Sequence, residues 1–286
     1  MRVLIVGCGY VGIPLGERLV RAGHQVDGLR RSAAGDQAMN PRGIAPVHAD
    51  IAAPASLAKL EPHYDWVVNL ASSSRGGVAE YRAVYLEGMR NLLAWLKARP
   101  PKQFVYTSST SVYAQNDGSV VTEESPAEPL SETSQVLRQA EQALLGQFPA
   151  IVLRTSGIYG RERGHLFKQY LKGEAVLRDD GAAYINMVQV EDVAGAIEHC
   201  LADGAPAGIY NLSDDEPVTQ RDFFAWLANE LNRPLPPSAP SDPARKRGLT
   251  NKRVSNAKLK RTTGFAFRHP TFREGYRHEM ERLGLL

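Results

Sequence analysis

Three glycines near the amino terminus are spaced to bind a phosphate group with main-chain atoms. Gly7, Gly9 and Gly12 form a G-x-G-x-x-G pattern, in which Tyr10 and Val11 precede the third glycine. The first glycine permits a tight turn, the second lets the backbone approach a pyrophosphate, and the third lets a helix pack on a strand. The free amide groups of that helix then face the phosphates. The pattern predicts a dinucleotide site, with a ligand-free glycine-rich turn as the alternative.

Two arginines follow the second expected strand, at the position that selects between dinucleotides. Proteins that prefer NAD usually carry an acidic residue here, which binds the ribose 2′-hydroxyl. Arg30 and Arg31 occupy this position, whereas Asp27 comes too early because it lies within the strand. Guanidinium groups can bind the 2′-phosphate of NADP in a bidentate manner. We therefore predict NADP as the cofactor, with NAD as the alternative; an exposed basic turn is the explanation without a ligand.

Two further strand ends are expected to border the same cofactor. Asp50 and Ile51 follow the third expected strand and could lie beside the adenine. Leu70, Ala71 and Ser72 end the fourth expected strand and could run beneath the cofactor. Both segments are also compatible with plain strand ends.

Short apolar runs that alternate with amphipathic segments must position these residues. Such alternation is typical of βαβ units and a parallel sheet. Helical spacing is expected within 85–96, 192–201 and 220–231. We predict an α/β fold, a Rossmann-type doubly wound parallel sheet with a smaller C-terminal substrate-binding region. The expected strands are Arg2–Val6, Gln25–Leu29, Pro46–Ala49, Trp66–Ala71, Gln103–Thr107 and Ala150–Leu153.

The alternation of strands and helices loosens after about residue 160, which suggests where the two regions divide. We expect residues 1–160 to form the dinucleotide-binding domain and residues 161–286 to form the C-terminal region. A strand near 185–190 and a helix over 192–202 are expected to return to the first domain.

The composition is that of a globular protein and argues against several functional classes. The 286 residues are 43% hydrophobic and 23% charged, and the net charge of +3 is too small to indicate nucleic acid. The sequence has no apolar stretch of membrane-spanning length, and its first apolar run is too short for a signal peptide. Two distant cysteines give neither metal-site spacing nor a disulfide framework. We expect a cytoplasmic protein without a metal, whose oligomeric state is open and compatible with a homodimer.

The whole chain resembles the extended short-chain dehydrogenase/reductases, the NAD-dependent epimerase/dehydratase family. The resemblance implies a Rossmann-type sheet, a nicotinamide cofactor and a small polar substrate, often a nucleotide sugar. Its motifs follow the family order and are specific in combination. They are Gly7–Gly12, Tyr85–Leu93, Phe104–Tyr113, Thr122–Pro126, Leu153–Arg154, Ile158–Gly160, Val190–Ala194 and Tyr210–Ser213.

The resemblance implies a catalytic hydroxyl at the end of the fifth expected strand. Ser109 occupies that position, and its hydroxyl would bind a substrate hydroxyl or carbonyl during hydride transfer. Ser108 and Thr110 are alternatives, because a shift of one residue reverses the face that a strand presents. For each of the three, a polar strand end that satisfies its own backbone is the structural alternative.

The tyrosine and lysine of the family's Tyr-x-x-x-Lys pair are missing. The spacing to Glu141 places the tyrosine at Thr133 and the lysine at Leu137, and none of the eleven tyrosines has a lysine four residues later. In the family the tyrosine acts as general acid/base and the lysine lowers its pKa. The sequence therefore predicts an atypical active site. Three tyrosines are candidates for replacing the acid/base, and each could equally be a packed aromatic: Tyr81, Tyr113 and Tyr159.

The substrate is expected to meet the C-terminal region. A stretch without acidic residues runs between Asp242 and Glu274, where the family often places an arginine against a substrate diphosphate. Arg253 is the expected contact, because a guanidinium fork suits phosphate; a solvated basic face is the alternative. Asn186 and Gln189 lie in a segment that usually faces the family's substrate pocket.

Two functions are compatible with these features. The first is an NAD(P)-dependent oxidoreductase or epimerase whose substrate is small and polar, with anionic and nucleotide-sugar-like compounds included. The second is a non-catalytic NADP-binding redox sensor. The missing pair favours the sensor, whereas the intact strand end at Thr107–Ser109 and the full-length substrate region favour the enzyme.

Overall fold

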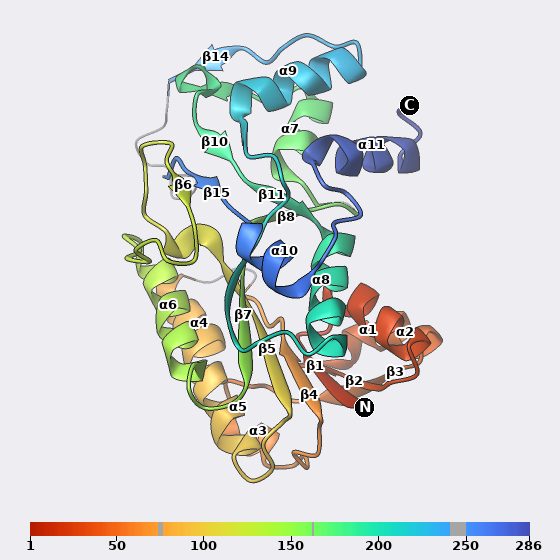
Figure 1. Cartoon of the computed structure of the whole chain (residues 1–286). Helices are drawn as coiled ribbons and strands as arrows, with labels where there is room; N and C mark the ends of the chain where they lie inside the picture. The colour runs from red at the N-terminus through yellow and green to blue at the C-terminus, as the bar shows by residue number, and fades with distance from the viewer. Residues whose placement is uncertain (74–76, 162, 241–249) are drawn as a thin grey trace.

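A seven-stranded parallel sheet forms the centre of the chain. The computed structural model describes residues 1–73, 77–161, 163–240 and 250–286. The strands of the sheet are β1 Arg2–Val6, β2 Gln25–Arg30, β3 Ile44–His48, β4 Trp66–Asn69, β5 Gln103–Ser109, β7 Ala150–Thr155 and β12 Gly208–Leu212. Their order is β12-β7-β5-β4-β1-β2-β3, and every neighbouring pair is parallel (Figure 1). The chain thus winds outward from β1 in both directions, which confirms the predicted doubly wound fold.

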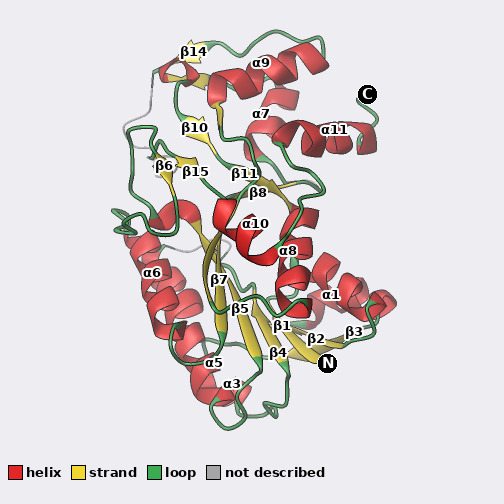
Figure 2. Cartoon of the chain, in the orientation of Figure 1, coloured by secondary structure: helices red, strands yellow, loops and turns green. Residues whose placement is uncertain are grey.

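Helices cover both faces of the sheet (Figure 2). On one face, α1 Gly12–Arg21 and α8 Val190–Ala202 pack their apolar residues on β1 and its neighbours. On the other face lie α5 Gly88–Leu96 and α6 Glu132–Leu144, with a π-helical turn, η3 Arg82–Glu87, leading into α5. Strands buried on both faces explain why their sequences are nearly continuous apolar runs.

Short helices connect the larger elements. They are α2 Asp36–Met39, α3 Pro54–Leu57, α4 Val78–Tyr81, α10 Ala257–Thr263 and the 3₁₀ turns η1 Ala33–Gly35, η2 Asn40–Arg42, η4 Thr110–Val112 and η5 Asp179–Gly181.

A smaller C-terminal region lies at the end of the molecule opposite α3 (Figure 1). Its helices, α7 His165–Lys172, α9 Gln220–Glu230 and α11 Phe272–Arg282, enclose an aromatic core around Phe223 and Tyr276. Four two-stranded ladders lie outside the central sheet. They pair β8 Gly157–Tyr159 with β11 Met187–Gln189, β10 Tyr184–Ile185 with β13 Val218–Thr219, β9 Leu177–Arg178 with β14 Ser238–Ala239, and β6 Val120–Val121 with β15 Arg253–Val254. Two of them, β8 with β11 and β6 with β15, link this region to segments before residue 160.

The strand expected to return to the first domain near 185–190 is observed beside β8 and not in the central sheet. Residues 187–189 do form a strand, but this strand pairs with β8 outside the sheet. The free edge of β7 is taken by β12, which is longer and ends in buried residues. The helix expected over 192–202 is observed as α8, and α10 also packs on the sheet, so the two regions interleave along the chain.

Candidate active site

A cavity lies where the carboxyl ends of the parallel strands face the C-terminal region. Its volume is about 1470 Å³, which exceeds the roughly 300–1,000 Å³ of most ligand pockets. The cavity therefore has room for a dinucleotide and a substrate together. Open α/β sheets bind their ligands at this edge, and segments that follow β1, β2, β3, β4, β5 and β7 all line the cavity.

The glycine turn has the geometry of a phosphate cradle. Gly7 adopts a φ of +79°, and a side chain there would come within 2.6 Å of the Ala71 backbone nitrogen. Gly12 packs so closely on Ile5 that an added Cβ would lie 3.0 Å from its Cγ2 atom. Gly9 lines the cavity, and an added Cβ there would meet nothing nearer than a backbone oxygen at 3.9 Å. This open space beside α1 fits the pyrophosphate of a dinucleotide.

Two guanidinium groups border the cavity at the end of β2. Arg30 donates from Nη1 to the Cys8 carbonyl oxygen at 3.3 Å, and the more exposed Arg31 lies next to it on the cavity wall. Asp27 does not face the cavity, because it is buried and accepts hydrogen bonds from Tyr64 and Arg2 at 2.9 and 3.0 Å. The position that would carry an acidic ribose contact is therefore basic.

The two other strand ends expected to border the cofactor also line the cavity. Asp50 is fixed in a turn, since its Oδ1 accepts from the Ala52 amide at 2.9 Å. Ile51 packs on the helix at Gly88, where an added Cβ would lie 2.8 Å from its Cδ1. The full set of predicted cofactor contacts that line the cavity is Gly7, Gly9, Tyr10, Val11, Arg30, Arg31, Asp50, Ile51, Leu70, Ala71 and Ser72, whereas Gly12 supports the turn from behind.

The end of β5 presents three hydroxyl groups with different partners. All three residues line the cavity. Ser108 is buried and donates to Oε1 of Glu141 at 2.7 Å, so its hydroxyl is engaged behind the wall. Thr110 is buried in the turn that follows. Ser109 accepts from the Ser111 amide at 3.1 Å, and no described residue accepts its proton. Ser109 therefore retains a donor for a ligand.

Thr133 and Leu137 lie on α6 and line the cavity, at the place where the resemblance implies a tyrosine and a lysine. Leu137 is buried in an apolar cluster with Val254. Neither side chain can exchange a proton near neutral pH.

A chain of hydroxyl groups runs beside these two residues. Ser131 donates to Ser134 at 2.8 Å, and Ser134 donates to Ser111 at 3.0 Å; all three line the cavity. Ser131 also caps α6, which is the signal that sequence reasoning could have used to find this cluster. The wall is thus rich in groups that can bind hydroxyls.

Tyr113, one of the tyrosines proposed as a replacement acid/base, is engaged within the protein. Its hydroxyl donates to Asn211 at 2.8 Å and accepts from Arg154 at 2.9 Å. Burial raises the pKa of Tyr113. Its hydroxyl is therefore a structural link, although other atoms of the residue line the cavity.

The other two candidate tyrosines differ in position. Tyr159 is buried under α11, outside the cavity lining, and burial raises its pKa well above the ordinary value. Tyr81 lines the cavity beside Tyr85, with ring centroids 4.8 Å apart. Burial raises the pKa of Tyr85 to about 12.

A buried ion pair supports the wall from behind. Glu141 is fully buried and accepts from Nη2 and Nε of Arg154 at 2.8 and 3.1 Å. Arg138 contacts the same carboxylate at 3.0 Å. Because Arg154 also binds Tyr113, this network ties α6 and β7 to the segment after β5.

The residues expected to contact substrate are separated by the structure. Asn186 lines the cavity, whereas Gln189 caps α8 through the Glu191 amide and is buried outside the cavity lining. Arg253 also lies outside the lining, since its Nε donates to the Gly118 carbonyl oxygen at 2.8 Å. Its neighbour Lys252 faces the cavity instead, because successive residues of an extended segment point to opposite sides.

Sequence reasoning missed several cavity residues that come from distant segments. Arg163 lies over the Tyr10 ring, with its Cζ 4.0 Å from the ring centroid. Tyr184 and Thr250 come from the C-terminal region, and Lys252 lies beside them. A local motif gave no signal for these residues, because their position depends on the pairing of β15 with β6 and of β10 with β13.

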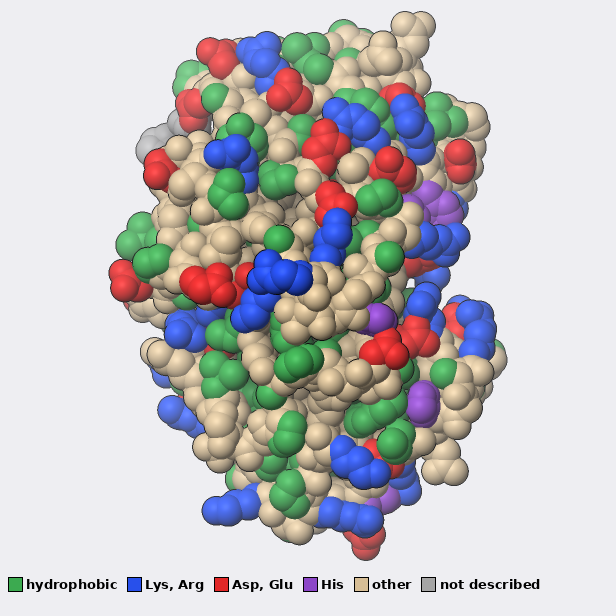
Figure 3. All heavy atoms as spheres, viewed as in Figure 1, with side chains coloured by type: hydrophobic (Ala, Val, Ile, Leu, Met, Phe, Trp, Pro, Cys, Tyr) green, Lys and Arg blue, Asp and Glu red, His purple; other side chains and the backbone are tan. Residues whose placement is uncertain are grey.

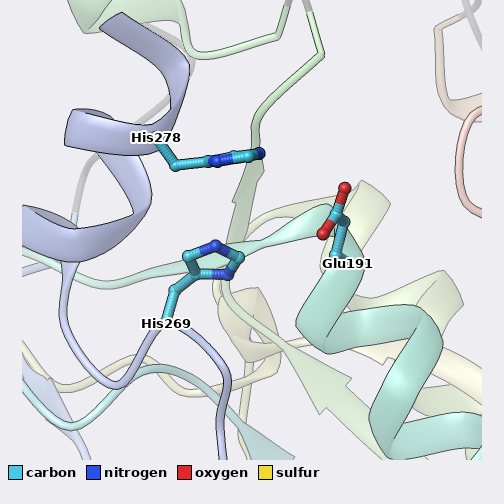
Figure 4. Close-up of side chains that lie close together, drawn as sticks. All are labelled: Glu191, His269 and His278. Carbon is cyan, nitrogen blue, oxygen red and sulfur yellow. The ribbon is translucent and has the colours of Figure 1, made fainter. Parts of the chain in front are cut away.

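A second cluster of titratable groups lies away from the cavity. Figure 4 shows Glu191 at the start of α8, His278 on α11 and His269 on the loop before it, with ligand atoms within 4.8 Å of one another. The two carboxylate oxygens of Glu191 are already paired, with Arg161 at 3.2 Å and Arg268 at 2.8 Å. Two guanidinium groups compete with any cation, so we assign no metal to this cluster.

In the described residues of the basic stretch after Asp242, several side chains pair with acidic residues from other parts of the chain. Lys260 pairs with Asp215 at 2.8 Å, and Arg268 pairs with Glu191. Figure 3 shows Lys and Arg side chains interspersed with Asp and Glu on the face viewed. This is unlike the surface of a single charge sign that binds nucleic acid; residues 241–249 lie outside the described part.

None of the described helices has the length and apolar character needed to cross a membrane.

The comparisons with known proteins agree with this architecture. The sequence model of the NAD dependent epimerase/dehydratase family matches residues 3–213. The chain is 27% identical to Protein YeeZ of Escherichia coli K12, over 94% of this chain and 96% of the relative. It is also 27% identical to 2′-dehydrokanamycin reductase of Streptomyces kanamyceticus, over 85% and 70% of the two chains.

A solved structure shares the fold at low identity. UDP-glucuronic acid 4-epimerase from Bacillus cereus, in complex with NAD, superposes with a TM-score of 0.82. The match covers 99% of each chain at 18% identity.

Proposed function

Because the chain belongs to the NAD-dependent epimerase/dehydratase family, we propose that it is an NAD(P)-dependent oxidoreductase or epimerase of a small polar substrate. The observation that supports this most directly is that one cavity runs from the glycine turn to Ser109 and Asn186. When bound, the nicotinamide would supply or accept a hydride at the substrate carbon. A redox sensor that only binds the cofactor needs the part of the cavity at the glycine turn, but it does not need the part at Ser109 and Asn186.

In this proposal the N-terminal half binds the cofactor. The amides at the start of α1 bind the pyrophosphate, and Gly9 leaves the space for it. Arg30 and Arg31 bind the 2′-phosphate, so NADP is preferred over NAD. NAD remains the alternative, which is supported by the NAD found in the epimerase structure of the same fold.

The substrate would bind against the hydroxyl-rich wall. Ser109 donates to the oxygen of the reacting carbon, and Ser111, Ser134 and Asn186 offer further polar contacts. A relative named as a reductase of 2′-dehydrokanamycin supports a substrate of many hydroxyl groups. We propose a sugar-like substrate, nucleotide sugars included, and the reaction at a carbonyl or secondary alcohol.

A redox sensor is the second candidate, and one observation favours it. Thr133 and Leu137 line the cavity where the family's acid/base and its lysine are implied. A sensor would bind the cofactor tightly without consuming it.

A screen of cofactor oxidation distinguishes the two. NADPH and NADH are each mixed with the protein and a panel of sugar aldehydes, ketones and nucleotide sugars, and absorbance at the nicotinamide band is followed. The nucleotide sugars are also incubated with the protein and NADP or NAD, and the products are analysed for epimerisation. We expect turnover with part of the panel, lowered in Ser109→Ala and retained in the control Ser238→Ala. Ser238 lies on the surface of the C-terminal region, with its hydroxyl bonded to Asp180. Saturable NADPH binding with neither cofactor oxidation nor epimerisation of any panel sugar would favour the sensor.

A further inference from the structure

The cavity contains a buried lysine from the C-terminal region that the sequence motifs did not identify. We propose that Lys252 is the acid/base of this site, in place of the missing tyrosine. Its ammonium group donates a proton to the substrate carbonyl oxygen in reduction, and its neutral amine accepts that proton in oxidation. The assignment rests on the proposed function, because it requires hydride transfer in the same cavity.

Lys252 lines the cavity, and its amino group is bonded to the segment that follows Ser109. Lys252 is 5% exposed, and its Nζ donates to the Tyr113 carbonyl oxygen at 3.1 Å and to Thr250 Oγ1 at 2.6 Å. Tyr113 follows Ser109 by one short turn, at the carboxyl end of β5. The amino group is thus anchored to the segment that carries the proposed substrate-binding hydroxyl.

The backbone of the lysine is fixed from the other side of the cavity. The Asn186 side chain donates to the Lys252 carbonyl oxygen at 2.9 Å and accepts from the Val254 amide at 2.7 Å. The Asn186 carbonyl oxygen in turn accepts from the Gly157 amide at 3.1 Å. Gly157 follows β7 and lines the cavity. Lys252 is therefore held between the carboxyl ends of β5 and β7, away from the adenosine end at Arg30.

The charge environment makes the amino group able to exchange a proton. Both acceptors of Lys252 that the structure describes are neutral oxygens, and no described carboxylate forms an ion pair with it. Burial without a counter-charge lowers the pKa of Lys252 to about 8. A group that titrates near neutral pH is populated in both the donating and the accepting form.

Several other titratable groups on the cavity wall are less suited to this role. Burial raises the pKa of Tyr85 and of Tyr113, and the Tyr113 hydroxyl is engaged with Arg154 and Asn211. Arginines cannot release a proton in a protein. Asp50 belongs to the turn after β3, at the end of the cavity assigned to adenosine.

The proposed reduction is balanced in atoms and electrons, and it needs only the substrate carbonyl, the reduced cofactor and a proton. In reduction, the hydride forms a C–H bond at the carbonyl carbon while the C=O π electrons move to oxygen. That oxygen takes a proton from the Lys252 ammonium, which becomes a neutral amine. The amine then regains a proton from solvent, so a carbonyl, a reduced cofactor and a proton give an alcohol and an oxidised cofactor.

The first test measures the ionisation of Lys252 directly. Protein labelled at lysine Cε with ¹³C is titrated by NMR in the presence of saturating NADPH, and the Lys252 signal is identified by its absence in Lys252→Met. We expect this signal to titrate near pH 8, separated from the surface lysines. A Lys252 signal that titrates with the surface lysines would overturn the assignment.

The second test separates an acid/base from a fixed positive charge. With the best carbonyl substrate of the screen, Lys252→Met and Lys252→Arg should both lower kcat by about 10²- to 10⁴-fold, because a positioned acid/base contributes that much. NADPH affinity should be unchanged. The control Lys258→Met, at a lysine of α10 outside the cavity lining, should keep the wild-type kcat. In wild type, kcat for reduction should fall as pH rises through about 8, because the ammonium is lost.

The results of the kinetic test distinguish an acid/base role of Lys252 from that of a fixed positive charge. If Lys252→Arg keeps kcat, or Lys252→Met raises only KM, the lysine is a charge that anchors an anionic substrate, and the assignment is wrong. If both variants keep the wild-type turnover, the assignment of Lys252 is wrong, but the proposed function is not affected. A wild-type protein that neither oxidises NADPH with any compound nor epimerises any nucleotide sugar overturns the proposed function, and the assignment fails with it. Thermal denaturation of each variant shows whether a loss of rate reflects a loss of folding.

Discussion

The two ends of the cavity are built in different ways. At the end proposed to bind the cofactor, consecutive strand ends supply the lining, from Gly7 to Ser72. At the substrate end, single side chains come from distant segments, among them Ser109, Thr133 and Lys252. The first construction depends on local sequence, whereas the second depends on how the C-terminal region packs on the sheet.

This difference shows where chemistry can change without loss of the fold. A phosphate cradle needs a turn conformation and a helix start, which a few adjacent residues specify. An acid/base needs only a titratable group within reach of the substrate, and any segment that borders the cavity can supply one. In this chain the α6 positions are Thr133 and Leu137, and a lysine at the start of β15 faces the same cavity.

The largest expected effect concerns the ion pair behind the substrate end. Glu141→Ala should lower the free energy of unfolding by about 3–5 kcal/mol, because it leaves the buried Arg154 guanidinium without its carboxylate. Chemical denaturation followed by circular dichroism measures this. As the matched control, Glu132→Ala removes an exposed carboxylate from the first turn of the same helix and should cost far less. Equal losses in the two variants would contradict a structural role for the network.

Lys252 should make the stability of the protein depend on pH. Its pKa is about 8 in the folded chain and 10.5 as an ordinary lysine, so the unfolded chain keeps the proton over a range where the folded chain has lost it. Wild-type stability should therefore rise between pH 8 and pH 10.5.

Lys252→Met should remove this rise. Below pH 8 the variant should be more stable by roughly 1–3 kcal/mol, since the cost of the buried charge is offset in part by two lost hydrogen bonds. Urea denaturation from pH 6 to pH 10 checks the sign. A variant that is less stable than wild type at pH 7 would argue against an unpaired buried charge.

At the cofactor end, Gly9→Val should weaken dinucleotide binding by at least about a hundredfold, because a side chain would occupy the pyrophosphate space. The fold should be retained, since an added Cβ meets no atom nearer than 3.9 Å. Gly7→Ala is the contrasting variant and should lower stability, because the φ of +79° and the contact at 2.6 Å leave no room. Fluorescence titration with NADPH and thermal denaturation separate the two effects.

The smallest expected effect concerns the choice of cofactor. Wild type should bind NADPH more tightly than NADH, with a difference that shrinks as salt rises. Arg30→Ala should reduce the preference by roughly tenfold, which corresponds to the loss of one charge-assisted contact. Arg31→Ala should reduce it less, because Arg31 is the more exposed of the two. If wild type binds NADPH and NADH with equal affinity at low salt, the two arginines do not bind the 2′-phosphate.

The sequence was most informative where a structure depends on neighbouring residues. It predicted β1 with its observed bounds, and it predicted the fold class and several strand ends that line the cavity. The long helices at α5, α8 and α9 also followed from apolar spacing.

Sequence reasoning was weaker where long-range pairing decides the outcome. The edge strand β12 was missed, and the pairing of residues 187–189 with β8 outside the central sheet was not predicted. Arg253 was expected at the substrate because of its guanidinium fork, but the register of β15 against β6 turns Arg253 toward Gly118 and Lys252 toward the cavity. Neither register nor edge order is encoded in a short motif.

The most direct test of the account is the transfer of deuterium from NADPH labelled at nicotinamide C4 to a sugar-like carbonyl compound, followed by mass spectrometry. The account predicts a deuterated alcohol with wild type, and formation of this product at least about a hundredfold more slowly with Lys252→Met at equal NADPH occupancy. Saturated NADPH binding without a deuterated product from any compound of the panel would contradict it.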